Sequence, residues 1–412
     1  MSNPYAEIFR VPGAIGFSSA GFIARLPIAM APIGIVAMLS QTHGEFWLAG
    51  AVAAVFAFAN ALISPQISRL VDRFGQVPVV APMTILSVGA FLVLVASASL
   101  EWPVWTLFVS AFVAATMPSM SAMVRARWSE IFSGRPELHT AFAFESAADE
   151  LIYIAGASLS VGLSVSLFPE AGVLANTILL ALGTTAFLLQ RSTEPKVKAQ
   201  TGRHSPASAI RLRPVQIITL ALIFVGAIFA TAEVSAIAIT KQLDQPGAAS
   251  LVIGVYATGS FVLGLVFGAV TIRISLQRQL LIAVSVVAIT TMPLLVAGSS
   301  VSLLATAVFV SGLAVSPTFI TAFALIERRV PASVLTEGVT WVMTGIGIGM
   351  ALGAFVAGWV VDEFGPHNGF WVSVASGAAS VLTVVVGQRS LAGDRLELPD
   401  RQVAKGAVAE VR

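Results

Sequence analysis

The chain of 412 residues contains no cysteine and few charged residues. Without cysteine there is no disulfide framework, no thiolate metal site and no thiol nucleophile. Asp, Glu, Lys and Arg make up 11% of the residues, whereas a soluble globular protein carries about 25%. Hydrophobic residues make up 57%. Because a lipid-facing surface cannot hold ionised groups cheaply, this composition indicates a protein that crosses a membrane several times.

Catalytic signatures are missing as well. The four histidines, His43, His139, His204 and His367, lie at span ends or in loops, with no HExxH and no metal-ligand spacing. No glycine-rich phosphate-binding loop is present, which argues against an ATP-driven pump on this chain. A membrane-embedded enzyme would need convergent His, Ser or ligand groups at one depth. We therefore predict no enzymatic activity, no metal and no cofactor.

Long apolar runs dominate what is present. A membrane-spanning helix needs about 20 apolar residues, and runs of this length are separated here by short charged or Pro/Gly breaks. The first run is too long, and too poorly preceded by basic residues, for a cleaved signal peptide. The pattern predicts about twelve spans in two sets of six. They cover about 11–40, 46–70, 77–99, 103–127, 140–167, 171–190, 214–241, 248–272, 277–298, 301–326, 333–361 and 370–388.

The only long polar stretch before the C-terminus lies between the two sets. It reads RSTEPKVKAQTGRHSPASAIRLR and has no apolar face to bury, which is typical of a linker. We therefore predict a first six-helix bundle over 1–190, a basic cytoplasmic linker over 191–213, a second bundle over 214–390, and a disordered cytoplasmic tail over 391–412.

The basic residues predict the orientation. All but two of the 23 Lys and Arg, namely Arg25 and Lys241, fall on the side of the membrane that holds the N-terminus. Because cytoplasmic loops are enriched in Lys and Arg, both termini are expected in the cytoplasm of a multi-pass cell-membrane protein. Loops on the opposite side carry acids instead: Glu45, Glu101, Glu170, Asp244, Asp362 and Glu363.

The two sets of spans echo each other. In each set the fourth span carries a proline and ends in two arginines, and the fifth opens with a glutamate and becomes glycine-rich. A parallel repeat implies two bundles with a substrate path between them near the midplane. The alternative is that Pro and Gly are simply common in membrane helices. The echoing residues are Pro118, Arg125, Arg127 and Glu145 in the first set, and Pro317, Arg328, Arg329 and Glu337 in the second.

The loop between the second and third spans carries a motif. Residues 68–76 read SRLVDRFGQ, which resembles the major facilitator superfamily signature G-x-L-x-D-R-x-G-R-[KR] at the place where that superfamily has it. With the spans, the repeat and the linker, the resemblance covers nearly the whole chain and is nearest to the drug/metabolite:proton antiporter branch. Leu70, Asp72, Arg73 and Gly75 match, whereas Ser68, Gln76 and Val77 depart from the signature.

The resemblance implies an all-α membrane protein with twelve transmembrane helices in two pseudo-symmetric six-helix bundles. It also implies that Asp72 contacts the N-terminus of span 11, near 333–336, and holds the cytoplasmic side shut. Loss of the trailing basic pair predicts a weaker latch. The family's drug antiporters often carry Gly-Pro on span 5, but Gly156–Gly162 contains no proline. This departure leaves export versus uptake open.

Arg25 is the most informative single residue. Residues 11–39 contain no other charge, so Arg25 lies roughly 20 Å into the first span. A charge at that depth costs at least about 2.5–3.5 kcal/mol unless it is paired or hydrated. Two interpretations remain. Arg25 is either one half of a structural ion pair, or a counter-charge that tunes a titrating acid or holds an anionic group.

Three acids in span 5, Glu145, Asp149 and Glu150, supply its candidate partners. Glu145 is expected about 10 Å deep, level with Arg125 and Arg127, where it would form a cytoplasmic latch. Asp149 and Glu150 are expected about 17 Å deep, at the level of Arg25. Burial favours the protonated acid and a nearby arginine favours the ionised one, so a motion that separates them moves a proton. Asp149 or Glu150 is therefore the predicted proton carrier.

Glu233 is a second candidate, as a proton carrier or as a site for a cationic substrate, because it is the only acid within its span. Polar residues within other spans are candidates for the substrate cavity, although each also has a packing interpretation. The predicted proton-coupling residues are Asp149, Glu150, Glu233 and Arg25. The predicted cavity residues are Asn60, Ser119, Tyr256, Thr318, Thr321, Trp341 and Thr344. The predicted cytoplasmic gate comprises Asp72, Arg73, Gly75, Arg125, Arg127, Glu145 and Glu337.

The embedded acids and the sparse polar lining favour a monomeric secondary transporter that works by alternating access. We expect proton-coupled export of a small apolar or amphipathic compound. The alternative is proton-coupled uptake of a small polar or anionic metabolite, with Arg25 as a carboxylate anchor. The expected partners are the substrate, protons and the lipid bilayer, and not nucleic acid, because the basic linker is explained by orientation and anionic headgroups.

Overall fold

The fold is entirely helical over the part of the chain that can be described. The computed structural model describes residues 4–43, 46–197, 208–245, 248–270, 272 and 274–392, and within them only α-helices and short 3-10 helices occur. In these ranges 11 helical segments are long and apolar enough to cross a membrane. The remaining predicted span, 103–127, is present as two shorter helices. The predicted all-α fold is therefore confirmed.

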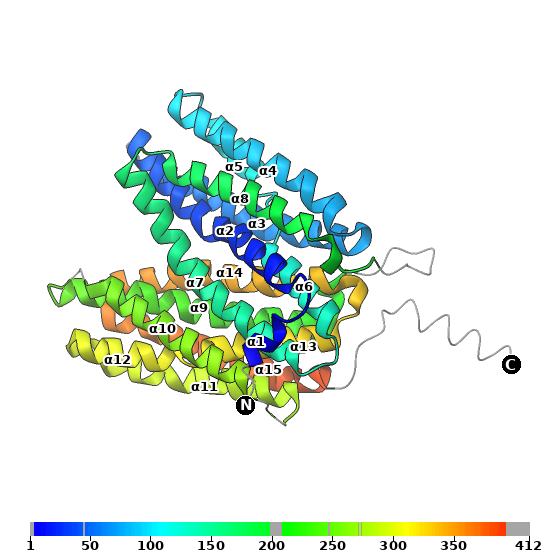
Figure 1. Ribbon diagram of the computed structural model, residues 1–412. Helices are drawn as coiled ribbons and strands as arrows, with labels where there is room; N and C mark the ends of the chain where they lie inside the picture. The colour runs from blue at the N-terminus through cyan, green and yellow to red at the C-terminus, as the bar shows by residue number, and fades with distance from the viewer. Residues whose placement is uncertain are drawn as a thin grey trace. The chain divides into compact units, whose positions relative to one another are not determined.

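The chain divides into two compact units, of which the first holds Met1–Ser133 and Ala148–Val197. Its long helices run alongside one another (Figure 1). Their bounds are α1 Pro4–Ile8, α2 Ala14–Thr42, α3 Phe46–Phe74, α4 Gln76–Ser99, α5 Trp105–Ala114, α6 Met120–Phe132, α7 Glu137–Ser166 and α8 Ala171–Leu189, followed by the 3-10 helix η1 Arg191–Thr193.

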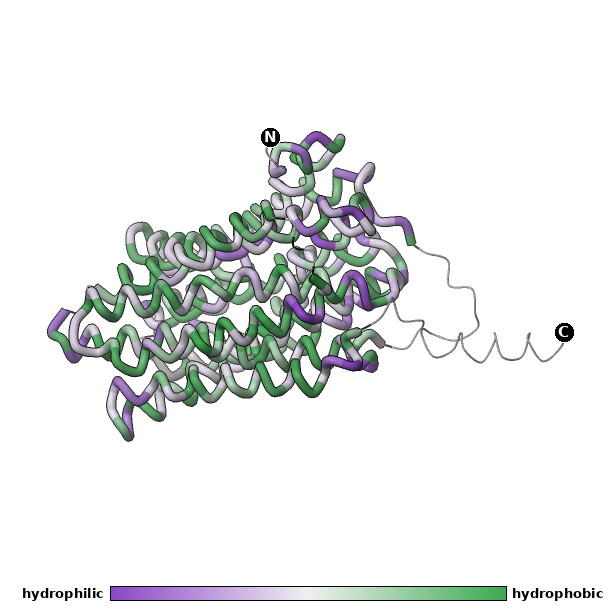
Figure 2. The backbone as a smooth tube through the Cα atoms, turned by 90° about the horizontal axis from the view of Figure 1, so that it is seen from below, coloured by the Kyte–Doolittle hydropathy of each residue, from purple (hydrophilic) through white to green (hydrophobic). Residues whose placement is uncertain are grey.

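The second unit holds Gly134–Ala147 and Lys198–Arg412. In both units hydrophobic residues fill most of each helix, and hydrophilic ones gather toward the helix ends (Figure 2). The bounds are η2 Ala209–Arg211, α9 Arg213–Gln242, α10 Ala248–Ala269, α11 Leu276–Thr290, η3 Met292–Ser299, α12 Val301–Gly312, α13 Val315–Arg329, η4 Ala332–Val334, α14 Leu335–Phe364, η5 Pro366–Gly369 and α15 Phe370–Leu391.

The division between the units differs from the predicted boundaries at α7. The prediction assigned all of 1–190 to the first bundle, but the first turns of α7 count with the second unit. The reason is local, because His139 Nε2 lies 3.0 Å from the carbonyl oxygen of Phe267, and Thr140 Oγ1 donates to that of Gly268 at 2.9 Å. These bonds satisfy carbonyls at the C-terminal end of α10. Linker residues 198–207 and tail residues 393–412 lie outside the described part.

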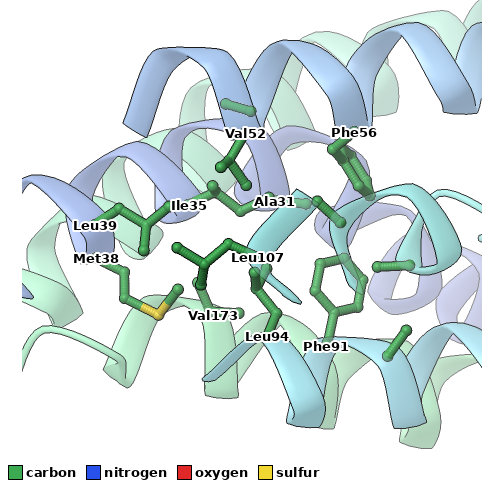
Figure 3. Close-up of a cluster of buried hydrophobic side chains, with 14 of the residues drawn as sticks. Ala31, Ile35, Met38, Leu39, Val52, Phe56, Phe91, Leu94, Leu107 and Val173 are labelled. Carbon is green, nitrogen blue, oxygen red and sulfur yellow. The ribbon is translucent and has the colours of Figure 1, made fainter. Parts of the chain in front are cut away.

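The core of the first unit is apolar and draws on five helices. Side chains of α2, α3, α4, α5 and α8 point toward one another, with Ile35, Phe91 and Leu107 among those that are fully buried (Figure 3). Phe56 and Phe91 add an aromatic contact with ring centroids 5.6 Å apart. Helices that pack in lipid gain little from excluding water between them, so close side-chain contact of this kind carries the association.

The second unit is held by backbone proximity between α9 and α14. A side chain at Gly226 would overlap the backbone of Ile346, and one at Gly349 would overlap that of Ile223. Small residues allow two membrane helices to approach this closely. The glycine-rich character of span 11 is therefore a packing feature of the second unit.

Both fourth spans are interrupted at matching places. In the first unit, α5 ends at Ala114 and α6 begins at Met120; in the second, α12 ends at Gly312 and α13 begins at Val315. Pro118 lies in the first break and Pro317 lies just after the second. Because proline cannot donate the backbone hydrogen bond of a helix, it favours such breaks.

Candidate functional site

A cluster of buried ion pairs joins three helices of the first unit. Arg25 Nη1 in α2 donates to Asp149 Oδ1 in α7 at 2.8 Å. Arg125 Nη2 in α6 donates to the second carboxylate oxygen, Asp149 Oδ2, also at 2.8 Å. Ser121 Oγ, one helical turn before Arg125, donates to Asp149 Oδ1 at 3.2 Å. One carboxylate therefore holds two guanidinium groups from two different helices.

The members of this cluster differ in exposure. The side chains of Arg25 and Arg125 are 1% and 0% exposed, whereas that of Asp149 is 17% exposed. Arg25 Nε also donates to the carbonyl oxygen of Gly21 at 3.1 Å, which ties the guanidinium to its own helix. Burying charges costs desolvation energy that only good geometry and further hydrogen bonds offset. Of the three charged groups, the acid is the most exposed.

The structure separates the three acids of span 5. Asp149 forms the ion pairs with Arg25 and Arg125, whereas the next residue, Glu150, is 7% exposed and turns about 100° away along the helix. Glu145 is fully buried and counts with the second unit. The predicted depth in the membrane was the same for Asp149 and Glu150, so it did not decide which of them pairs with Arg25. In the structure, Asp149 forms the ion pair. The latch role of Glu145 stays a prediction.

Arg127 lies in a second polar cluster of the first unit. Its Nε donates to Gln76 Oε1 at 2.9 Å, and its Nη1 donates to the carbonyl oxygen of Gln190 at 2.7 Å and to Thr193 Oγ1 at 2.9 Å. The guanidinium carbon lies 3.8 Å from the ring centroid of Phe187, within the range of a cation–π contact. These contacts join the ends of α4, α6 and α8.

The predicted latch between Glu145 and Arg125 or Arg127 joins the two units and stays a prediction. Residues two apart on a helix point about 200° away from each other, so Arg125 and Arg127 face different neighbours. The second unit has an equivalent contact, because Arg329 Nη2 at the end of α13 donates to the carbonyl oxygen of Ser390 in α15 at 3.0 Å. In both units an arginine of the fourth span binds a backbone carbonyl at the C-terminal end of the sixth.

The motif loop between α3 and α4 is fixed by Glu194, a residue of the predicted linker. Gly75 adopts φ +94°, a conformation that favours glycine. Glu194 Oε1 accepts the backbone N–H groups of Gln76 at 2.9 Å and Val77 at 3.0 Å, and so caps the N-terminus of α4. Residues 191–197 are thus part of the first unit. The sequence alone does not identify Glu194 as this cap. It indicates only that the free N–H groups at the start of α4 need some acceptor.

The gate residues of the motif lie at the end of α3. Asp72 is partly exposed and Arg73 is exposed. The predicted contact of Asp72 with the start of span 11 joins the two units and stays a prediction.

Asn60, a predicted cavity residue, supports the break in the fourth span. Its Nδ2 donates to the carbonyl oxygens of Ala115 at 3.0 Å and Met117 at 3.2 Å. Ser87 Oγ donates to the carbonyl oxygen of Ala114 at 2.6 Å. Because backbone groups freed by a helix break must find partners inside a membrane, these side chains make the break possible. Ser119, also predicted for the cavity, stands at the N-terminus of α6 and makes no side-chain cap there.

The other predicted cavity residues lie in the second unit. Thr318 and Thr321 are fully buried, and each donates to a carbonyl oxygen of its own helix at 2.8 Å. Tyr256 is 2% exposed and packs edge-to-face on Phe229, with ring centroids 5.2 Å apart. Thr344 is buried in α14. For the two threonines the packing interpretation accounts for the hydroxyl groups.

Two acids of the second unit have contrasting surroundings. Glu337, in the first turn of α14, is fully buried and accepts hydrogen bonds from Ser208 Oγ and, at 3.3 Å, from Trp341 Nε1. Its negative charge is also favourable at a helix N-terminus. Glu233, in α9, is partly exposed, and none of the described residues donates a hydrogen bond to its carboxylate or pairs with it.

No group of three His, Cys, Asp or Glu side chains within the described ranges is placed to hold a metal ion. The long apolar helices define a polytopic membrane protein. The Major Facilitator Superfamily profile matches residues 17–242 and 234–404. The chain therefore belongs to this superfamily, and it is a membrane transporter rather than an enzyme. Comparison with curated protein sequences gave no significant match.

Solved transporter structures share the fold at low sequence identity. A bacterial homologue of the iron transporter ferroportin superposes with a TM-score of 0.72 at 14% identity, over 90% of this chain and 98% of that chain. The transporter FucP gives 0.67 at 15% identity, over 91% and 98%. The human organic anion transporter MFSD10 gives 0.64 at 15% identity, over 92% and 100%. At these identities the likeness concerns the fold alone.

Proposed function

We propose that the protein is a proton-coupled secondary transporter in which Asp149 carries the proton. One observation carries the proposal: the Asp149 carboxylate bridges two almost fully buried arginines, Arg25 and Arg125, and is itself partly exposed. While it is ionised, the carboxylate holds α2 and α6 to α7. A proton taken up by Asp149 removes the charge that both guanidinium groups bind, and so weakens both contacts.

The break in the fourth span allows α6 to move when Asp149 takes up a proton. Ser121 and Arg125 both contact Asp149 and both lie on α6, which a non-helical segment separates from α5. Hinges are commonly a few residues at the end of an element. Release of Asp149 therefore frees α6 to move about residues 115–119, and this motion contributes to alternating access.

We further propose export of a small apolar or amphipathic compound across the cell membrane, with both chain termini in the cytoplasm. The apolar cores and the intrahelical bonds of Thr318 and Thr321 support a sparsely polar substrate path. The alternative is uptake of a small polar or anionic metabolite with Arg25 as its carboxylate anchor. The contacts of Arg25 with Asp149 and Gly21 favour the coupling role over the anchor role.

Reconstituted protein tests the coupling. Proteoliposomes loaded with the pH dye pyranine are challenged with chloramphenicol, a neutral amphipathic probe, and with lactate for the alternative. An imposed pH gradient is expected to drive chloramphenicol accumulation together with opposite proton movement. Asp149→Asn is expected to abolish gradient-driven accumulation while sparing counterflow.

The neighbouring variant Glu150→Gln separates the two predicted carriers, and it is expected to retain coupled transport. Normal accumulation by Asp149→Asn would show that this acid is not the carrier. Coupled lactate uptake in place of chloramphenicol export would establish the alternative substrate class and direction.

A further inference from the structure

The third span of the second unit changes helix type partway along. Its first part, α11, is an α-helix that ends at Thr290, and its last eight residues form the 3-10 helix η3. Runs of 3-10 helix longer than about three or four residues are uncommon, and one inside a longer helix often marks a hinge. The equivalent span of the first unit, α4, has the same length of 24 residues and is α-helical throughout. The length of the span therefore does not require η3.

The burial of η3 and of the residue before it follows a three-residue period. Thr291, Leu294 and Ala297 are buried, whereas Met292 and Val296 are 50% and 75% exposed. Side chains three residues apart point the same way in a 3-10 helix, but drift by about 60° in an α-helix. Leu294 and Ala297 belong to an apolar core cluster of the second unit. The 3-10 form is therefore the one that fits this core.

Local chemistry weakens the α-helical alternative at the start of η3. Pro293 has no N–H, so the carbonyl oxygen of Ile289 loses the donor that an α-helix would supply. Thr291 Oγ1 donates to the carbonyl oxygen of Ala288 at 2.7 Å, and the N–H of Leu294 donates to that of Thr291 at 3.2 Å. Pro293 is the only proline of η3, so the other residues of the segment can adopt either helix type.

A contact at the far end of η3 supports its present form. Gly298 is buried, and a Cβ atom added to it would overlap the imidazole ring of His367. The ring therefore occupies the place that a side chain at this position would take. His367 belongs to η5, which connects α14 to α15. Because the ring needs a face without a side chain, it fixes the rotation of the last turn of η3.

The two helix types would place the end of η3 differently. A 3-10 helix rises about 2.0 Å and turns about 120° per residue, and an α-helix about 1.5 Å and about 100°. Conversion of η3 to an α-helix would shorten the span by about 4 Å and turn Gly298 by about 140° away from His367. The α form gains better hydrogen-bond geometry, and the 3-10 form gains the core packing and the His367 contact. Opposing gains of this kind are what a two-state element needs.

We propose that η3 is a conformational switch that converts between 3-10 helix and α-helix, with the contact of His367 on Gly298 holding the longer form. A single residue, Ser300, joins η3 to α12, and its Oγ accepts the N–H of Leu303 at 3.3 Å. Shortening of η3 therefore draws the start of α12 along the span. Because residues 313–314 separate α12 from α13, α12 can follow this motion while α13 stays in place. The switch lies within the second unit and does not depend on proton coupling at Asp149.

Distances within the span test the switch, because the chain contains no cysteine that would compete for spin labels. Labels on Arg278→Cys and Ser299→Cys, both at exposed positions, report the length of the span by double electron–electron resonance on full-length protein in liposomes. We expect a main population at about 36 Å for the 3-10 form and a second at about 32 Å for the α form. Pro293→Ala restores the missing N–H and His367→Ala removes the contact, so each should shift the population toward the shorter distance.

The first unit supplies a matched control. Pro78→Cys and Ser99→Cys are exposed positions of α4 with the same separation in sequence, and they should give one distance of about 32 Å with or without the substitutions in η3 and η5. Thermal unfolding verifies that each variant is folded. A single distance equal to that of the control would show that the span is α-helical throughout. A single longer distance that neither Pro293→Ala nor His367→Ala changes would show that η3 is rigid, and either result would overturn the proposal.

Discussion

The helices of the two units are held together by different interactions. The first unit buries a network in which Asp149 bridges Arg25 and Arg125. The second packs α9 against α14 through glycines and leaves Glu233 with no pairing partner among the described residues. In the first unit buried charge is structural, because it joins three helices. In the second, α9 and α14 are held together through glycines that let the two backbones approach closely.

The largest expected effect tests this contrast directly through the two acids. Asp149→Ala removes the carboxylate that two buried guanidinium groups share. It should therefore lower the free energy of unfolding by about 3–5 kcal/mol. Glu233→Ala removes a partly exposed acid that no described residue pairs with, so it should be neutral or slightly stabilising. Thermal unfolding of both variants in the same detergent, followed by tryptophan fluorescence, measures the difference. Equal losses would mean that Glu233 also supports the fold.

The glycine packing of the second unit provides the next test. Gly349→Leu forces a side chain into the backbone of Ile223, and should cost about 1–3 kcal/mol or prevent folding. Gly347→Leu is a matched control, because a side chain added at Gly347, two residues earlier on α14, meets nothing within 4 Å. Size-exclusion profiles and unfolding temperatures distinguish the two. A well-folded Gly349→Leu variant would show that α9 and α14 can separate without loss of the second unit.

Much of the fold could be predicted because a bilayer imposes length and polarity on each helix. The predicted span 171–190 is helix α8 at Ala171–Leu189, and 214–241 is α9 at Arg213–Gln242. The hydropathy pattern does not predict the break at 115–119, although Pro118 lies in it. Hydropathy averages over such an interruption, and the side chain that supports it, Asn60, comes from another helix.

The sequence predicts the contacts of the candidate site only where they follow from the depth of a residue in the membrane. Helical rise placed Asp149 and Glu150 level with Arg25, because depth follows from residue number alone. Choosing between them needed the rotation of α7 about its axis, which the sequence does not fix. Depth also grouped Arg125 with Arg127, although their opposite directions along α6 could have separated them. Glu194 was missed because its contact with Gln76 joins residues 118 apart in the chain.

The smallest expected effect compares the starts of two equivalent helices, α4 and α11. Glu194 caps α4 through two backbone N–H groups, whereas Ser275 at the start of α11 makes no side-chain cap. Glu194→Ala should therefore cost about 0.5–2 kcal/mol, while Ser275→Ala should change the unfolding free energy by little. Glu194→Gln keeps an acceptor but loses the charge that favours a helix N-terminus, so it should fall between wild type and Glu194→Ala. If Glu194→Ala unfolds like the wild type, the Glu194 cap does not stabilise the first unit. The start of α4 would then depend on the contacts of Gln76 with Arg127 and Met123.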